Sequence, residues 1–156
     1  MIDHLRSNNR YAITIFLAIA AIIIECLYII CGTSCSKLKG EIFGIKQLEY
    51  IGIGYMVVIA ILAILRKDRY IVILLSAGVG SEIYLVGFQL WHHTYCLYCL
   101  IFAAIVVVQF ILNCNKEKKM VILLSMVISF ALFFIFFKGA TTLQYPLDEG
   151  TVSFLI

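Results

Sequence analysis

The sequence predicts an all-α membrane protein, with a four-helix transmembrane bundle and a fifth transmembrane helix. Two observations predict this class: the composition and five long apolar segments. Of the 156 residues, 63% are hydrophobic and 13% are charged, and the mean hydropathy is +1.06. A soluble domain is about 45–50% apolar and about 25% charged. The chain therefore has too few polar residues to cover a surface in water, and the same numbers exclude a disordered chain.

Each apolar segment approaches the roughly 20 residues that a helix needs to cross a bilayer. The segments are Tyr11–Ile30, Tyr50–Leu65, Tyr70–Trp91, Cys96–Leu112 and Met120–Phe137. Runs of this length exclude the alternating pattern of a membrane barrel. The connections between them are short and polar, so we expect neighbouring helices to run antiparallel. In the tail, 139–156, we expect strands at Thr141–Tyr145 and Thr151–Ile156.

The distribution of Lys and Arg predicts the orientation, since cytoplasmic loops carry an excess of both. With the N-terminus in the cytoplasm, the cytoplasmic segments hold eight of these residues and the outer segments hold four. This orientation places residues 31–49, residues 92–95 and the tail outside. The first helix lacks a small-residue cleavage site, and we interpret it as an uncleaved anchor.

Four of the six cysteines fall at the outer face in this orientation. Cys96 and Cys99 form a C-x-x-C at the start of the fourth helix, so both sulfurs point the same way. A helix N-terminus favours a thiolate. Cys31 and Cys35 end the first helix and open the outer loop. Two neighbouring dithiols on the oxidising side of a membrane are typical of an electron relay by thiol–disulfide exchange.

Two other interpretations use the same residues. Cys31, Cys35, Cys96 and Cys99, together with His92 and His93, are a set that a soft metal would bind, as in a non-enzymatic metal-binding or metal-transport protein. The cysteines also suit inert structural disulfides. We expect the remaining pair, Cys26 and Cys114, to be inert.

The order of these motifs resembles the vitamin K epoxide reductase family, and its bacterial members in particular. The resemblance covers roughly residues 11–112. After the first helix come the outer cysteine pair with Cys35-Ser36, the stretch Gly40–Ile45, a helix that opens with Gly52-Ile-Gly54-Tyr55, and the C-x-x-C of the fourth helix. In the other quinone-dependent disulfide-generating family of bacteria the C-x-x-C comes first, which argues against that family.

The resemblance implies a four-helix catalytic domain at 1–112 that encloses a quinone of the menaquinone or ubiquinone type. Residues 113–138 then form a cytoplasmic loop and the fifth transmembrane helix, before the extracytoplasmic tail. The implied location is the cytoplasmic membrane of a bacterium, with the active site outside. The implied activity is that of a quinone-dependent thiol:disulfide oxidoreductase, which couples disulfide formation in exported proteins to quinone reduction.

The resemblance also implies a role for each catalytic cysteine. Cys99 reacts with the quinone, and Cys96 is its partner. Cys35 attacks Cys96, and Cys31 takes electrons from a thioredoxin-like protein. Many bacterial members carry that protein as a domain after a fifth helix, and here we expect it as a separate extracytoplasmic partner. Beside this protein we expect membrane lipid and the quinone as partners, and no nucleic acid.

The chain departs from the family in two places. Three residues separate Cys31 from Cys35, fewer than the family usually has. Ala103 stands where the animal enzymes have Tyr, which weakens the case for vitamin K epoxide as a substrate. Ser36, in contrast, matches the family's Ser or Thr after the second loop cysteine, and we place it with the quinone-binding residues.

A polar stripe on the third helix completes the predicted site. Glu82 lies midway along this helix, where a charge costs on the order of 2.5–3.5 kcal/mol on insertion scales. Gln89 and His93 follow at helical spacing and point toward the C-x-x-C. We predict that Glu82 and Gln89 bind the quinone or relay protons; the alternative for Glu82 is a hydrogen bond that serves packing. For Glu25 we favour a carboxylate that reaches back to the membrane surface.

Overall fold

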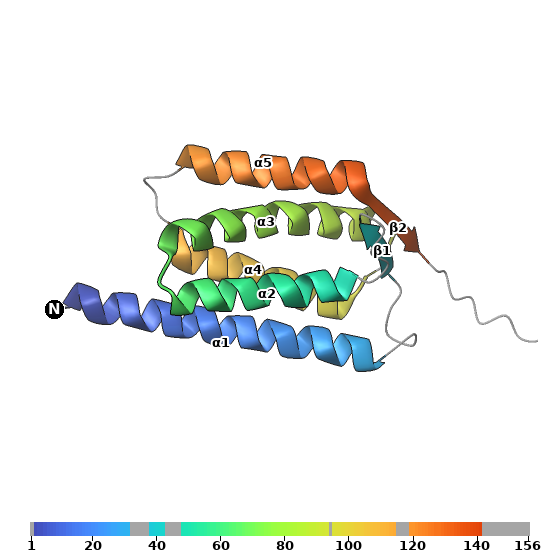
Figure 1. Cartoon of the computed structure of the whole chain (residues 1–156). Helices are drawn as coiled ribbons and strands as arrows, with labels where there is room; N and C mark the ends of the chain where they lie inside the picture. The colour runs from blue at the N-terminus through green and yellow to red at the C-terminus, as the bar shows by residue number, and fades with distance from the viewer. Residues whose placement is uncertain (1, 32–37, 43–47, 94, 115–118, 142–156) are drawn as a thin grey trace, which may run out of the picture.

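The structure is a computed structural model that describes residues 2–31, 38–42, 48–93, 95–114 and 119–141. It contains five helices, one for each predicted apolar segment. They are α1 (Ile2–Cys31), α2 (Leu48–Ile64), α3 (Asp68–Trp91), α4 (Leu97–Asn113) and α5 (Lys119–Phe136). The helices lie side by side, and successive helices run in opposite directions (Figure 1). The prediction of a helical fold built on these segments is confirmed.

Three helices are long and apolar enough to cross a membrane, which indicates membrane association. These are α1, over Asn9–Ile30, and the whole of α3 and α5. The other two, α2 and α4, are apolar but have 17 residues each, at the lower end of the usual range of about 17–25.

Two short strands form an antiparallel sheet at one end of the bundle, called here the sheet end. Strand β1 (Leu38–Ile42) follows α1, and β2 (Phe137–Thr141) follows α5, with Gly40 opposite Gly139. The sheet end also holds the last turns of α1 and α3 and the first turns of α2 and α4 (Figure 1). The sequence analysis did not predict β1, and it placed the first tail strand four residues too late. Residues 142–156, with the second predicted strand, lie outside the described residues.

Two tight corners require a left-handed backbone at residues that carry a side chain. Arg66, between α2 and α3, has φ 55°, and His93, between α3 and α4, has φ 52°. His93 therefore stands after the end of α3, and its side chain is exposed. The prediction that a helical stripe from Glu82 runs on to His93 is wrong, because α3 ends at Trp91 and the chain turns there.

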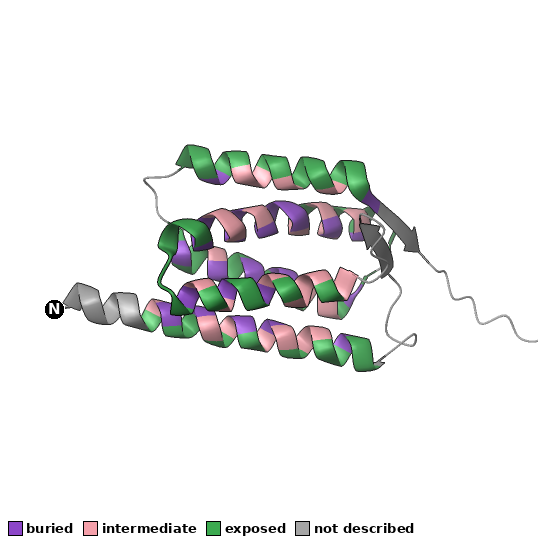
Figure 2. Ribbon diagram, in the orientation of Figure 1, coloured by how far each residue is buried: buried purple, intermediate pink, exposed green. Residues whose placement is uncertain are grey.

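The core between the helices is apolar through the middle of the bundle. One cluster joins α1, α2, α3 and α4 through Ala18, Ala21, Met56, Val79, Phe102 and Val106. Small residues on α1 let it approach α2 and α4 closely, as is common where helices pack in a membrane. Buried residues on these helices face inward, whereas α5 is exposed along nearly its whole length (Figure 2). Ile122 is the buried residue of α5.

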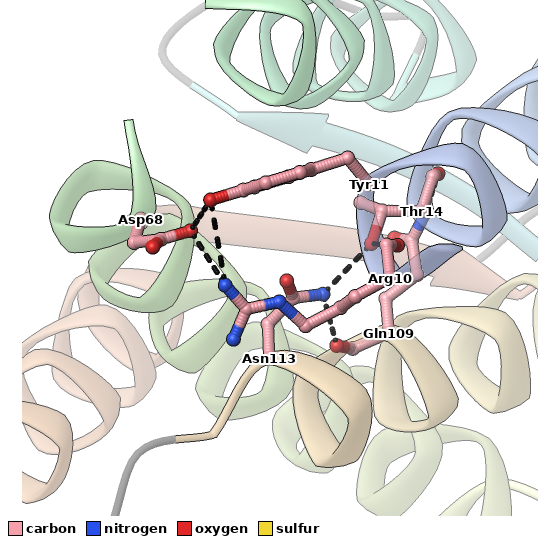
Figure 3. A network of polar contacts seen from close by, with 6 residues as sticks. All are labelled: Arg10, Tyr11, Thr14, Asp68, Gln109 and Asn113. Atoms are coloured by element: carbon pink, nitrogen blue, oxygen red, sulfur yellow. Dashed lines mark hydrogen bonds and ion pairs between the residues drawn. The ribbon is translucent and has the colours of Figure 1, made fainter. Parts of the chain in front are cut away.

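Polar contacts hold together the end of the bundle opposite the sheet (Figure 3). Arg10 on α1 forms an ion pair with Asp68 at the start of α3, with 2.9 Å between Arg10 Nη2 and Asp68 Oδ1. The Tyr11 hydroxyl donates to the same oxygen at 2.7 Å. On α4, the side-chain amides of Gln109 and Asn113 donate to the Thr14 carbonyl and hydroxyl oxygens at 3.0 and 2.9 Å. These contacts tie α1 to both α3 and α4.

The contact between α3 and α5 depends on a glycine. A Cβ atom on Gly80 would overlap the carbonyl oxygen of Met126 on α5. Near this crossing the Ser125 hydroxyl donates to the Ile73 carbonyl oxygen at 2.9 Å. Toward the sheet end, Tyr84 packs against Phe130, Phe133, Phe134 and Phe137. The backbones of α3 and α5 therefore meet directly at Gly80 and are separated by aromatic rings nearer the sheet.

We predict that Gly80→Ala destabilises the bundle by about 1–3 kcal/mol, the usual cost of overpacking. The added methyl group must push α5 away from α3, because its nearest neighbour is backbone rather than a flexible side chain. Gly87→Ala on the same helix is the control, since a Cβ there meets nothing within 4 Å. Unfolding in detergent micelles measures both. Equal stability of the two variants would contradict the close contact.

Candidate functional site

The C-x-x-C lies at the sheet end, at the start of α4. Cys96 is the N-cap of this helix, with an extended backbone (φ −105°, ψ 109°), and its sulfur accepts the backbone N–H of Cys99 at 3.4 Å. The Cys99 thiol donates to the same sulfur, with 2.7 Å between the two Sγ atoms. Both cysteines are free. A disulfide bond needs about 2.05 Å, so the two sulfurs need to move only slightly when an oxidant removes two electrons and the thiol protons leave.

Gln89, in the last turn of α3, holds the start of α4 in place. The backbone N–H of Cys96 donates to Gln89 Oε1 at 3.0 Å. Gln89 is only 1% exposed, and its Nε2 has no hydrogen-bond partner among the described residues. Gln89 thus acts on the backbone of the C-x-x-C, and the free Nε2 donor lies next to that contact.

Hydrogen bonds also stabilise the ionised form of Cys96, which lies one residue before α4. The bond from the Cys99 thiol lowers the pKa of Cys96 from 9.0 to about 7, and the Cys99 N–H acts in the same direction. Burial of Cys96 opposes this shift but is the weaker effect. The hydrogen bonds from Cys99 therefore favour the thiolate at Cys96.

A cavity of about 240 Å³ lies between the helices next to Cys99. All five helices contribute to its wall, including Ser129 and Phe133 from α5. Its remaining lining residues are Glu25, Tyr28, Leu48, Glu49, Ile51, Gly52, Tyr55, Leu74, Ala77, Gly78, Ser81, Glu82, Leu85, Cys99 and Phe102. The wall is mostly apolar and aromatic, as in typical small-molecule sites. Cys99 is one of the lining residues, whereas Cys96, next to Cys99, is not.

Two glycines make room for polar side chains in this wall. A Cβ atom on Gly78 would overlap the hydroxyl oxygen of Tyr55, which donates to the Leu74 carbonyl oxygen at 3.0 Å. A Cβ atom on Gly52 would lie 3.4 Å from Glu25 Oε1. Glu25 on α1 therefore reaches toward α2 at the level of the cavity, and Tyr55 on α2 reaches toward α3.

The predicted site residues divide into three groups. Cys96, Cys99 and Glu82 lie at the cavity or next to it, and Gln89 supports Cys96 from behind. The backbone of Cys31 ends α1 at the sheet end, but its side chain is not described. Cys35 and Ser36 lie outside the described residues.

The described residues allow a partial test of the metal-binding interpretation. No group of three or more His, Cys, Asp or Glu side chains in these ranges is arranged to hold a metal ion. His92, His93, Cys96 and Cys99 are all described, so these four members of the proposed metal set do not form a site by themselves.

Glu25 lines the cavity, which the sequence did not lead us to predict. We expected this carboxyl to reach back to the membrane surface. The signal was present in the helical spacing of α1. Ala18, Ala21 and Tyr28 are buried, and Glu25 lies on the same face at helical intervals from them.

Comparison of the chain with protein-family models, with curated proteins and with solved structures found no match.

We predict that Cys99→Ala raises the pKa of Cys96 from about 7 toward 9.0, because it removes the thiol that donates to the Cys96 sulfur. The measurement is the ultraviolet absorbance of the thiolate against pH, in a background with the other four cysteines replaced by Ser. Cys99→Ser is the matched variant, since its hydroxyl restores a donor and should keep the pKa lower than in Cys99→Ala. An unchanged titration in Cys99→Ala would show that the Cys99 thiol does not stabilise the thiolate.

Proposed function

We propose that this protein is a membrane thiol oxidoreductase that couples disulfide formation in a thioredoxin-like extracytoplasmic protein to quinone reduction. The main support is that Cys99 lines a mostly apolar cavity while its sulfur lies 2.7 Å from the sulfur of Cys96. A dithiol in this position can meet a lipid-soluble oxidant on one side and exchange with another thiol on the other. The order of motifs that resembles the vitamin K epoxide reductase family supports the same proposal.

The proposed topology places all five helices across the bilayer, with the N-terminus in the cytoplasm and the sheet end outside. In this arrangement α1 to α4 form the four-helix bundle around the cavity, and α5 packs beside it against α3. The excess of Lys and Arg in the cytoplasmic segments supports the orientation. Disulfides persist on the outer side, which suits a dithiol at that end.

The cavity fits the ring of a quinone. Its volume of about 240 Å³ exceeds the roughly 150 Å³ of a cavity that binds benzene. Phe102 and Tyr55 supply aromatic surface, and Glu82 in its acid form can donate to a carbonyl oxygen. The Ser81 hydroxyl already donates to the Gly78 carbonyl oxygen at 2.8 Å. A bound quinone of the ubiquinone or menaquinone type would accept two electrons and two protons. The role of the bundle is to hold this oxidant against Cys99.

The proposed relay begins at the first cysteine pair. The partner's dithiol reduces the Cys31–Cys35 disulfide by exchange. Cys35 then attacks Cys96 in the Cys96–Cys99 disulfide, which forms a Cys35–Cys96 mixed disulfide and frees Cys99 for the cavity. Cys31 attacks Cys35 in this mixed disulfide, which forms the Cys31–Cys35 disulfide again and frees Cys96. The position of Cys31 at the end of α1 supports this route, because Cys96 caps α4 at the same end of the bundle.

We predict that Cys99→Ala or Cys96→Ala abolishes anaerobic reduction of menadione by dithiothreitol above the protein-free rate. Cys31→Ala and Cys35→Ala should keep this rate within about twofold but lose the rate with reduced thioredoxin as donor, since a small dithiol reaches Cys96 directly. The decrease in quinone absorbance measures both reactions.

Cys114→Ala and Cys26→Ala are matched controls, because both side chains are exposed and neither lines the cavity. Turnover retained in Cys99→Ala would contradict the proposal. So would a wild-type protein that is inactive and carries stoichiometric zinc or copper, which would favour a metal site.

A further inference from the structure

Three carboxyl groups line the cavity, each from a different helix. Glu49 lies in the first turn of α2 at the sheet end, Glu25 lies on α1, and Glu82 lies midway along α3. Glu25 is close enough to interact electrostatically with both Glu49 and Glu82. The lining includes no Lys, Arg or His among the described residues. The three groups therefore form a series from the sheet end into the cavity with no basic partner in its wall.

A role in helix packing alone does not explain why three carboxyl groups line this cavity. Each carboxyl in an apolar setting costs free energy, and the cost falls when the group is neutral. A neutral carboxylic acid carries a proton that it can donate. Carboxylic acids in the wall of this cavity, beside a reactive thiol, can supply protons at the point where the proposed reaction consumes them.

The proton balance of the reaction requires such a donor when Cys96 reacts as the thiolate. The Cys96 sulfur accepts hydrogen bonds from both the N–H and the thiol of Cys99, which favour the ionised form of Cys96, and a pair ionised in this way holds one proton between two sulfurs. When the sulfurs join, two electrons leave them, and the Cys99 thiol gives up one proton. The quinol that results needs two protons, so the second must come from another group in the cavity.

We infer that Glu25 and Glu82 supply this second proton to the quinone oxygen and that Glu49 returns it from the sheet end. The inference rests on the proposed function and goes beyond it, by assigning the acid. In one turnover the Cys96–Cys99 bond forms, the quinone gains two electrons, one thiol proton and one carboxyl proton, and one carboxylate remains. That carboxylate regains its proton from outside through Glu49.

The first test is kinetic and uses the full-length protein with dithiothreitol and menadione. Glu82→Gln and Glu25→Gln should each lower kcat by about tenfold or more, and the double variant by on the order of 10²-fold, the usual share of general acid catalysis. The KM for menadione should stay within about twofold. Glu82→Asp should restore much of the rate, which a purely packing role would not allow. Asp68→Asn is the control, because it makes the same change at the far end of α3.

The second test needs no quinone. Oxidising the reduced protein with diamide removes the negative charge beside the carboxyls, so the infrared difference spectrum should contain a carboxylic acid C=O band. Glu82→Gln or Glu25→Gln should reduce this band, and Asp68→Asn should not. Wild-type protein without the band would overturn the inference, even if a Gln variant fails to fold.

The two proposals fail in different ways. If wild type reduces menadione through Cys99 but both Gln variants keep kcat within about twofold, the acid assignment is wrong and the proposed function stands. If wild type shows no Cys99-dependent turnover, both are wrong.

Discussion

A polar group buried between apolar helices has little access to water, so leaving it without a hydrogen-bond partner costs free energy. At the start of α4, one of the acceptors of a backbone N–H group is a sulfur atom. The N–H of Cys99 bonds to the Cys96 sulfur, and the N–H of Cys96 bonds to Gln89 on α3. Because these bonds cap the helix and fix it against α3, they also decide where both thiols lie. The cysteine pair and Gln89 thus also provide acceptors for backbone N–H groups at the start of α4.

The same constraint explains the contrast between the two ends of the bundle. At the far end, Thr14, Gln109 and Asn113 bond to one another, and Arg10 pairs with Asp68. Between the middle of the bundle and the sheet end, the carboxyls of Glu25 and Glu82 face a cavity whose described lining contains no basic side chain. Polar side chains at the far end therefore bond to one another, whereas carboxyl groups line the cavity beside Cys99.

The helices and the cysteine pair were predictable from the sequence because their signals are local. Apolar run length located all five helices, and the spacing of Cys96 and Cys99 put both sulfurs at one helix start. Features that depend on contacts between distant segments were not predictable. The pairing of β1 with β2 joins residues about 100 positions apart, and the cavity wall includes α5, which lies beyond the predicted catalytic domain. Glu25 was misjudged for a different reason, because its spacing from Ala18, Ala21 and Tyr28 already placed it on the buried face of α1.

The central claim is that Cys99 and Cys96 together reduce a molecule held in the cavity. The most direct measurement adds one equivalent of menadione, without oxygen, to fully reduced protein that carries Cys31→Ala and Cys35→Ala, so that the first pair cannot take over the disulfide. The free thiols are then alkylated and the peptides are mapped by mass spectrometry. The account predicts one quinone consumed per protein and a disulfide between Cys96 and Cys99. Both cysteines recovered in alkylated form, or quinone left unchanged, would contradict it.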